Sequence, residues 1–383
     1  MQKKTAFIIA VGIAISLTGC VSTPENLKEQ KNSSQQAEKK DGIQLDSLKN
    51  VLDCAKDIQG QTYENLYFAD NFQVNQPEQI GKIEFSQRKD FDKDGMQILK
   101  EFVKEIDPKI KVDTNLVKPG LQYIDEKGQE SFSLGNDGFL YYAYEEGDSW
   151  ISVKNGDTEE YELVEQVCVE YEYDNKSFQW KDKEVSLTDI VETAQKSADE
   201  FTKKYDSMSW RPSILLVYEN KQGEYYFEVR FTKSYQGADL FYEDYRKALD
   251  YVKAPYVSVM QPYMVFNSSK EMLAVDNYPG ILDYNKTIEE YDNIITLQCA
   301  SELLSDKLSS YKAYNVYHVN LEYRLVQTDG EKVEKDGYYC NWRAGNIYET
   351  SPCWTFYLSN DMDRMTFAMV DCVTGEVEFV SGE

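Results

Sequence analysis

The sequence predicts an α+β protein of two domains, each with a helix packed on an antiparallel sheet, after a signal peptide and a disordered tether. Two observations predict this class. Apolar residues recur at helical spacing in a few segments and alternate with polar residues in many others, as in half-buried strands. The 30 tyrosines and 17 phenylalanines also favour sheets, because aromatic side chains suit pleated, half-buried surfaces. A chain of 383 residues is long enough for two domains with separate cores.

The first 20 residues have the composition of a secretory signal. Two lysines precede an apolar run from Ala6 to Leu17 that is too short for a comfortable spanning helix. The run ends in Leu17-Thr18-Gly19-Cys20, which resembles the lipobox of bacterial lipoproteins. The resemblance implies that residues 1–19 are removed as a lipoprotein signal peptide and that Cys20 carries a diacylglycerol. The alternative is a short buried helix that ends in Gly-Cys by chance.

The anchor and the charge of the chain limit its location and partners. Acyl chains of palmitate length would hold the mature protein on the extracytoplasmic face of the cell membrane. Loss of Lys3 and Lys4 changes the formal net charge from −26 to −28, so we expect repulsion from nucleic acid and no nucleic-acid partner. Residues 20–42, the lipidated cysteine and a polar segment without apolar periodicity, are expected to form a disordered tether. Such a tether spans roughly 25 Å.

Residues 43–180 are expected to form the N-terminal α+β domain. A short helix is predicted near Leu45–Ile58, and the clearest helical spacing runs from Met96 to Ile106, where Asp107-Pro108 ends it. The period then changes to that of strands, which are predicted at 139–144, 150–153 and 161–173 with Gly-containing turns between them.

Residues 181–383 are expected to form the C-terminal α+β domain. Helices are predicted at 186–205 and 288–308, and Arg211-Pro212 separates the first helix from the following hairpin. Strands are predicted at 214–218, 225–231, 256–259, 263–266, 272–275, 317–325, 354–358, 365–370 and 377–380. In the strand at 317–325 the odd-numbered apolar residues are expected to face the core, with His318, Asn320, Glu322 and Arg324 in solvent.

The succession of a helix and strands occurs twice, at 187–231 and at 288–380, and two sequence features within it resemble a known family. Tyr225-Tyr226-Phe227-Glu228-Val229 with Gly237 resembles PepSY-type extracytoplasmic modules. The segments at 352–356 and 370–377 are similar to the endings of PepSY-like and YycH/YycI-type regulatory domains, with Cys372 where alanine is usual. The same ending occurs in uncharacterised lipoproteins of monoderm bacteria. The resemblance covers about half of the chain and provides no catalytic residues.

Most sequence signals of an enzyme are missing. The single histidine, His318, is expected to be a plain surface residue, which removes His-cluster metal sites and most acyl-transfer mechanisms with a histidine base. No nucleophile elbow, phosphate loop, His-Glu-x-x-His or Cys-x-x-Cys motif occurs. Hydrolysis by a pair of carboxylates needs no histidine, but no pair stands out among 67 acidic residues. We therefore predict no catalytic residue.

One motif matches a metal site. Asp90, Asp92, Asp94 and Glu101 fit the spacing of a calcium loop, and Gly95 lies where that loop turns. Against calcium, Gln97 lies where an apolar residue usually packs the loop, and no second hand is present. The alternative is that one of these aspartates caps the predicted helix. No other cofactor is expected.

The even number of cysteines after Cys20 permits disulfides outside the cytoplasm. They are Cys54, Cys168, Cys299, Cys340, Cys353 and Cys372. Cys340 and Cys353 flank a loop that contains Gly345, and we predict a bridge between them. The alternative is a set of buried free thiols.

These observations predict a lipid-anchored, non-enzymatic binding or regulatory module that acts through contacts with a membrane or envelope protein. YycH/YycI-type proteins, which the C-terminal segments resemble, are membrane-tethered and influence a sensor kinase through such contacts. One alternative is a surface lipoprotein that captures a glycan or peptide with exposed aromatic side chains. A second alternative is a carboxylate-based hydrolase.

Overall fold

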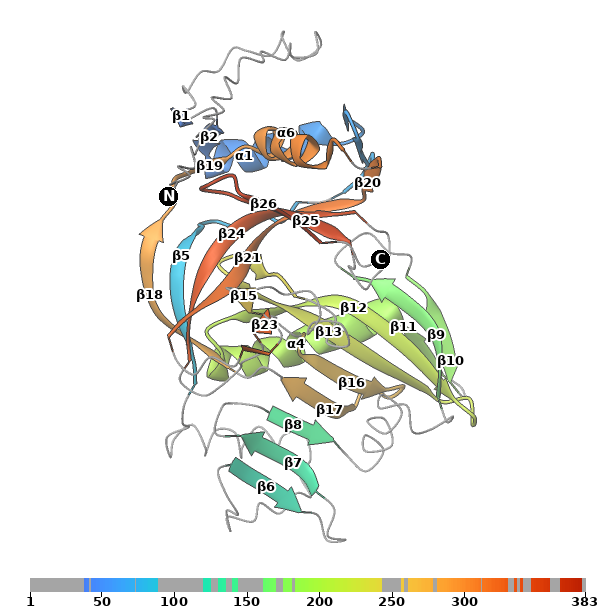
Figure 1. The fold of residues 1–383 in the computed structure, drawn as a ribbon. Coiled ribbons are helices and arrows are strands. Elements are labelled where there is room, and N and C mark those ends of the chain that lie inside the picture. The colour runs from blue at the N-terminus through green and yellow to red at the C-terminus, as the bar shows by residue number, and fades with distance from the viewer. Residues whose placement is uncertain are drawn as a thin grey trace, which may run out of the picture. The chain divides into compact units, whose positions relative to one another are not determined.

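The computed structural model describes residues 38–40, 43–72, 74–88, 120–124, 130–135, 140–143, 161–169, 175–180, 183–242, 256–257, 261–277, 281–310, 312–329, 334–335, 338–339, 346–358 and 366–380. These parts are rich in strands and contain few helices (Figure 1). The helices are α1 (Leu48–Cys54), the 3-10 helix η2 (Ala55–Ile58), α4 (Leu187–Tyr205) and α6 (Leu297–Leu308). Among the described residues, no helix is both long and apolar enough to cross a membrane.

Sixteen of the described strands belong to one branched sheet. Its path joins β18 (Leu282–Glu290), β5 (Gly81–Gln87), β24 (Ile347–Tyr357), β21 (His318–Asp329), β14 (Ala238–Leu240), β13 (Tyr225–Tyr235), β16 (Tyr263–Asn267), β17 (Met272–Asn277), β8 (Leu140–Ala143), β7 (Glu130–Gly135) and β6 (Gly120–Ile124). Its branches are β9 (Tyr161–Cys168), β12 (Ser209–Asn220), β15 (Tyr256–Val257), β25 (Phe367–Asp371) and β26 (Val377–Val380). Every described pair in this sheet is antiparallel except β14 with β21, which is parallel.

The remaining described strands form small sheets. They are β1 (Glu38–Lys40), β2 (Ile43–Ser47) and β19 (Asn293–Ile295); β3 (Thr62–Tyr63), β4 (Leu66–Phe68) and β20 (Tyr314–Val316); β10 (Ser177–Trp180) and β11 (Lys183–Ser186); and β22 (Glu334–Lys335) and β23 (Tyr338–Tyr339). The pairing of β2 with β19 brings the start of the described chain next to a segment almost 250 residues later.

Helix α4 covers one face of β12 and β13, and its core confirms the amphipathic pattern predicted for residues 186–205. Ser186 begins the helix as its N-cap, because its hydroxyl accepts a hydrogen bond of 3.1 Å from Asp189 N. The apolar side, which is fully buried, consists of Leu187, Ile190, Ala194, Ala198 and Phe201. We call the surrounding cluster, built from residues between Val167 and Ile281, the α4 core.

Helix α6 covers β25 and β26 and contributes to a second cluster, which we call the α6 core (Figure 1). Its members come from both ends of the described chain, mainly between Val51 and Phe85 and between Leu282 and Cys372. Trp354 is fully buried and donates its indole N–H to the Ile295 carbonyl at 2.8 Å, which links β24 to the segment that precedes α6.

The predicted domain boundary at 180/181 is not confirmed. Strands β5, β8 and β9 precede it, yet they pair with β24, β17 and β12, which follow it. Most of the α6 core comes from residues before and after the α4 core, but its members Met208, Ala238 and Leu240 lie within the sequence range of the α4 core. Hydrophobic periodicity reports which face of a strand is buried and carries no information on its partner, so a boundary drawn from local pattern missed these long-range pairs.

The hairpin and most tail strands match their predicted positions, including β12, β13, β16, β17, β21, β25 and β26. The predicted end of the first helix at Tyr205 is confirmed, whereas Arg211-Pro212, predicted to separate this helix from the hairpin, lies within β12 beside a bulge. The short helix predicted near 45–58 begins at Leu48, after β2. The helix predicted at 96–106 and the strand predicted at 150–153 lie outside the described residues.

The long helix predicted at 288–308 is wrong in its first half. Residues up to Glu290 belong to β18, which pairs with β5, and Ile294 and Ile295 belong to β19. The helix starts only after Thr296, whose hydroxyl accepts a hydrogen bond of 3.2 Å from Cys299 N as the N-cap. Apolar residues of short strands fell by chance at helical spacing, and sheet pairing overrode that pattern.

The prediction that one side of β21 faces solvent is also wrong. His318, Asn320, Glu322 and Arg324 are each at most 4% exposed. The sheet is therefore covered on both faces at this strand: Val319 and Leu321 belong to the α6 core, and the polar residues face a separate cluster that contains Phe241, Tyr357 and Phe367.

Candidate functional site

Several residues that the sequence singled out lie outside the described residues: Cys20, Asp90, Asp92, Asp94, Glu101 and Cys340. Cys353 is described and is 2% exposed, and because Cys340 lies outside the described residues the bridge between them stays a prediction. The Cys353 Sγ donates to the Ser351 carbonyl at 3.7 Å, and burial raises the pKa of this thiol to about 12. Within the described ranges, no group of three His, Cys, Asp or Glu residues could hold a metal ion.

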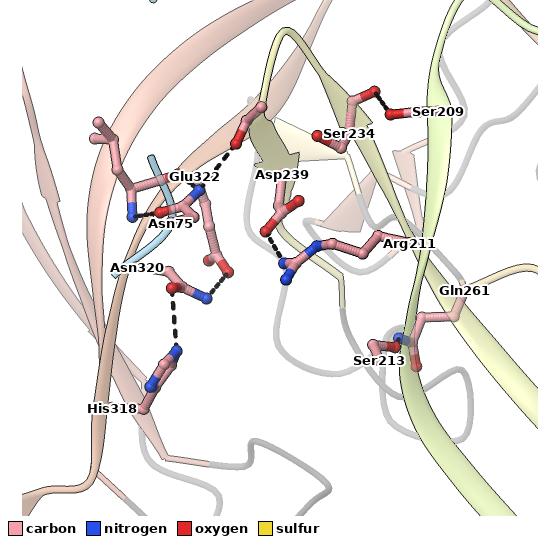
Figure 2. A network of polar contacts seen from close by, with 12 residues as sticks. Asn75, Ser209, Arg211, Ser213, Ser234, Asp239, Gln261, His318, Asn320 and Glu322 are labelled. Atoms are coloured by element: carbon pink, nitrogen blue, oxygen red, sulfur yellow. Dashed lines mark hydrogen bonds and ion pairs between the residues drawn. The ribbon is translucent and has the colours of Figure 1, made fainter. Parts of the chain in front are cut away.

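The most polar part of the described interior is a row of side chains on one face of β21, which we call the β21 polar row: His318, Asn320, Glu322 and Arg324. Alternate residues of a strand share a face, so these four are neighbours. His318 Nε2 lies 3.0 Å from Asn320 Oδ1, and Asn320 Nδ2 donates to Glu322 Oε1 at 3.3 Å (Figure 2). Arg324 forms an ion pair with Glu378.

Strand β24 supplies further partners for the β21 polar row. The Tyr357 hydroxyl lies 2.8 Å from both carboxylate oxygens of Glu322 and donates to them. The Tyr357 ring also lies 5.9 Å from the His318 ring, centroid to centroid, and Phe72 meets that imidazole edge-on at 6.3 Å. A buried carboxylate is tolerated when donors satisfy it, which explains how Glu322 can be 1% exposed.

Two polar contacts lie beside the pairing of β14 with β21. Arg211 of β12 points at Asp239 of β14 and forms an ion pair with it, and Asp239 is 1% exposed (Figure 2). The side-chain amide of Asn75 makes two hydrogen bonds to the backbone of Leu321. Asn75 Nδ2 donates to Leu321 O at 2.7 Å, and Leu321 N donates to Asn75 Oδ1 at 2.8 Å. Its amide thus takes the place of a neighbouring strand where β21 would otherwise have an open edge.

The β21 polar row specifies structure. Its members are almost completely buried and bond to one another, to Tyr357 and to Glu378, so a ligand has no access to them in this conformation. Such a network favours one strand register over others, because a shifted register would bury its charges without partners.

A cleft of about 630 Å³ lies next to helix α1, apart from the β21 polar row, and we call it the α1 cleft. Three segments line it: the start of α1 (47–53), the loop before β5 (76–80) and the turn between β18 and β19 (290–292). Two backbone hydrogen bonds of 3.0 Å fix these walls, from Leu48 N to Asp292 O and from Tyr291 N to Ile80 O.

The floor of the α1 cleft is apolar and its rim is acidic. Leu48, Leu52, Pro77, Ile80 and Tyr291 form the buried or half-buried part. The exposed lining residues include four acids and one cation: Asp53, Glu78, Glu290, Asp292 and Lys49. Burial raises the pKa of the Tyr291 phenol to about 12, and the negative charge of the nearby Glu289 is the second cause of this rise. The Tyr291 hydroxyl therefore stays neutral at physiological pH.

No sequence motif pointed to the α1 cleft. Its three walls are far apart in the chain, and the loop at 76–80 shows neither helical nor strand periodicity. The turn at 290–292 was also assigned to a helix, which would have spread its acidic residues around the helix surface. A local signal exists only for the beginning of α1, where Ser47 accepts a hydrogen bond from Asn50 N as the N-cap.

Comparison with known proteins finds one similar solved structure. No family model matches the chain, and no curated protein matches it. A crystal structure of an uncharacterized protein from Eubacterium rectale ATCC 33656 is similar over 87% of this chain and 94% of that chain, with 14% identity and a TM-score of 0.46.

Proposed function

We propose that this protein is a lipid-anchored, extracytoplasmic module that binds a membrane or envelope protein and regulates it by contact, without catalysing a reaction. The observation that carries the proposal is the position of the α1 cleft. Its first wall, at 47–53, follows directly on β2, which is the first strand after the proposed tether. The short β1 lies within residues 20–42, so the chain is already paired with β2 before the tether was expected to end. An anchor at Cys20 would therefore keep the cleft close to the membrane face.

The shape of the cleft supports binding of a partner segment. Its volume, about 630 Å³, lies within the range of roughly 300–1,000 Å³ that is typical of ligand sites. Its floor offers apolar surface for burial, and the charged rim offers orientation and specificity. The PepSY-like and YycH/YycI-type features of the C-terminal strands agree with a regulatory role and remain part of this proposal.

We also propose that the α4 core and the α6 core mark two domains, each with a helix on an antiparallel sheet. In this arrangement the α4 domain is an insertion between the two main parts of the α6 domain. The α6 domain would then carry the α1 cleft and the segment that follows the tether in sequence.

Crosslinking in living cells tests the proposed function. A photo-reactive residue is placed at Gln79 in the cleft of the full-length protein, with Lys196 on the exposed side of α4 as the matched control position. We expect one membrane or envelope protein to be captured from Gln79 and not from Lys196, and we expect Cys20→Ser to abolish the capture. Equal capture from both positions, or capture that survives loss of the anchor, would contradict the proposal.

A carboxylate-based hydrolase is the second candidate, because four carboxylates surround the same cleft. A glycosidase pair needs one carboxyl group in an apolar setting that keeps its proton and a second one that stays ionised. Asp53, Glu78, Glu290 and Asp292 are all exposed, so the geometry favours attraction of a cation over proton transfer. If the protein released sugar from envelope polysaccharide and Glu78→Gln abolished this release, the hydrolase would become the preferred function.

A further inference from the structure

We propose that the α1 cleft binds a basic peptide segment, one that carries lysine or arginine side chains and lies next to the membrane in a partner protein. This inference rests on the proposed function and names the partner chemistry of the same site. Four acidic side chains of the rim and the apolar floor beneath them carry it.

The rim carboxylates lack internal partners. None of Asp53, Glu78, Glu290 and Asp292 makes a side-chain hydrogen bond or an ion pair within the described residues. Charged residues nearby do find partners: Lys82 pairs with Glu349 at 2.5 Å, and Lys286 pairs with Glu84 at 3.1 Å. The cleft therefore keeps a local excess of negative charge that an incoming cation can neutralise.

The single cation in the lining does not cancel this excess. Lys49 is exposed on α1 and forms no ion pair within the described part of the chain. Lys49 adds one positive charge where four acids gather, so the lining keeps a net charge of −3. A cationic ligand would be attracted by the four acids and repelled by Lys49. Removal of an acid should therefore weaken its binding, and removal of the Lys49 charge should strengthen it.

The apolar floor selects among cations. Lysine and arginine have apolar stems and charged tips, so they can lay the stem on Leu48, Leu52 or Ile80 and reach the acidic rim with the tip. A small hydrated cation gains nothing from such a floor. A membrane surface is excluded as the occupant, because anionic headgroups are repelled by the rim.

The place of the cleft in the chain favours a segment next to the membrane. Ser47 ends β2, and the proposed tether between Cys20 and β1 would span roughly 20–25 Å. The proposed anchor would therefore keep the α1 cleft within reach of the first residues of a partner that emerge from the bilayer.

Direct binding tests the inference. The full-length protein is held in nanodiscs of neutral lipid and titrated with a synthetic peptide of alternating lysine and leucine, with a glutamine-leucine peptide as the neutral comparison. We expect the lysine peptide to bind, its affinity to fall as salt is raised, and the neutral peptide to bind at least about tenfold more weakly. Equal binding of the two peptides would overturn the inference.

Variants of equal charge separate the cleft from the general acidity of the protein. The cleft variant carries Asp53→Asn, Glu78→Gln and Glu290→Gln, and the control carries Glu184→Gln, Glu192→Gln and Glu200→Gln at exposed sites around α4. Both gain three charges, so only a local effect distinguishes them. We expect about tenfold weaker binding in the cleft variant and less than about threefold in the control. The same loss in both variants would overturn the inference.

A gain of affinity excludes damage to the fold as the explanation. Lys49→Gln removes the repulsive charge, so we expect this variant to bind the lysine peptide more tightly, by about twofold to fivefold. Unchanged or weaker binding would contradict the inference. Spermine that competes at the concentration of the lysine peptide would also contradict it, since the apolar floor would then play no part.

The tests of function and of ligand can fail separately. If Gln79 captures a membrane protein through a neutral or acidic segment, the proposed function stands and the basic-peptide inference fails. If the lysine peptide binds the cleft but no partner is captured in cells, the ligand chemistry stands and the regulatory function fails.

Discussion

At the scale of single residues, the interior contains charges that the sequence pattern did not reveal. Lys233 lies in β13 and Asp206 follows α4, and the Lys233 amine lies 3.1 Å from an Asp206 carboxylate oxygen. Both side chains are completely buried, and the Trp210 indole donates to the same carboxylate oxygen at 3.2 Å. Burial lowers the pKa of Lys233, and the negative charge of Asp206 opposes this lowering. The charged form of Lys233 is therefore stabilised by Asp206.

Removal of one member of this pair should be costly. Asp206→Asn keeps the shape of the side chain but leaves the buried Lys233 without its counter-charge, so we expect a loss of about 3–5 kcal/mol in the free energy of unfolding. Glu165→Gln is the matched control, since it breaks an ion pair with Lys176 whose side chains are 25% and 50% exposed. We expect the control to lose less than about 1 kcal/mol in urea unfolding. Similar losses in both variants would contradict the prediction.

The carboxylate of Glu322 is the second buried charge that depends on named donors. Tyr357→Phe removes a hydroxyl that donates to it at 2.8 Å and leaves the ring in place. Because hydrogen bonds to charged groups are the stronger ones, we expect a loss of about 1.5–3 kcal/mol. Tyr67→Phe, at a tyrosine that is 44% exposed, should change stability by less than about 0.5 kcal/mol. Chemical unfolding of the two variants side by side would decide the matter.

Alkaline pH should weaken the fold through buried tyrosines. Burial, followed by the nearby Glu302, raises the pKa of Tyr63 from 10.0 to about 12. Between these values the unfolded chain loses the phenolic proton and the folded chain keeps it, so stability falls as the pH rises through this window. Tyr63→Phe removes this titration, so its unfolding midpoint should fall less steeply with pH than that of the parent. Parallel declines would contradict this assignment.

At the scale of elements, local signals decided where helices begin, and pairing decided where strands lie. The beginning of α4 at Ser186 was predictable, because a capping serine precedes a regular apolar stripe. The beginning of α6 was not, because Ile294 and Ile295 continued an apparent stripe while pairing with β2 as β19. The burial of the β21 polar row was also unpredictable, since alternation shows two faces and does not tell that both are covered.

The corrected start of α6 can be tested at its cap. Thr296→Ala removes the hydroxyl that accepts from Cys299 N, so we expect a loss of about 1 kcal/mol in unfolding free energy. Thr296→Ser retains the acceptor and should stay within a few tenths of a kcal/mol of the parent, an estimate that follows from the similar rank of the two capping residues. If the helix began near Ile288 instead, position 296 would lie mid-helix, and Thr296→Ala would not show the loss expected for a removed cap, because alanine favours a helix interior more than threonine.

At the scale of the whole molecule, the sequence predicted an α+β chain, and its division at 180/181 is not confirmed because several strand pairs cross it. A local pattern identifies strands but does not identify their partners. The partners of β5 and β8 lie more than a hundred residues later in the chain, and the partner of β9 lies closer. The α1 cleft was missed for the same reason, because three distant segments form it. The pairing of β13, which contributes to the α4 core, with β14, which contributes to the α6 core, joins the two cores in one sheet.

Calorimetry can determine whether the two cores are two cooperative units. Phe201→Ala opens a cavity in the α4 core, where Phe201 is fully buried 4.8 Å from the Trp210 ring, and should cost about 3–5 kcal/mol. Leu304→Ala is its counterpart in the α6 core and should cost about 2–5 kcal/mol. Two domains predict two thermal transitions, each lowered by only one of these variants. If both variants lower one shared transition, the β13–β14 pairing and the Arg211–Asp239 ion pair couple the cores into a single unit, and the two-domain proposal fails.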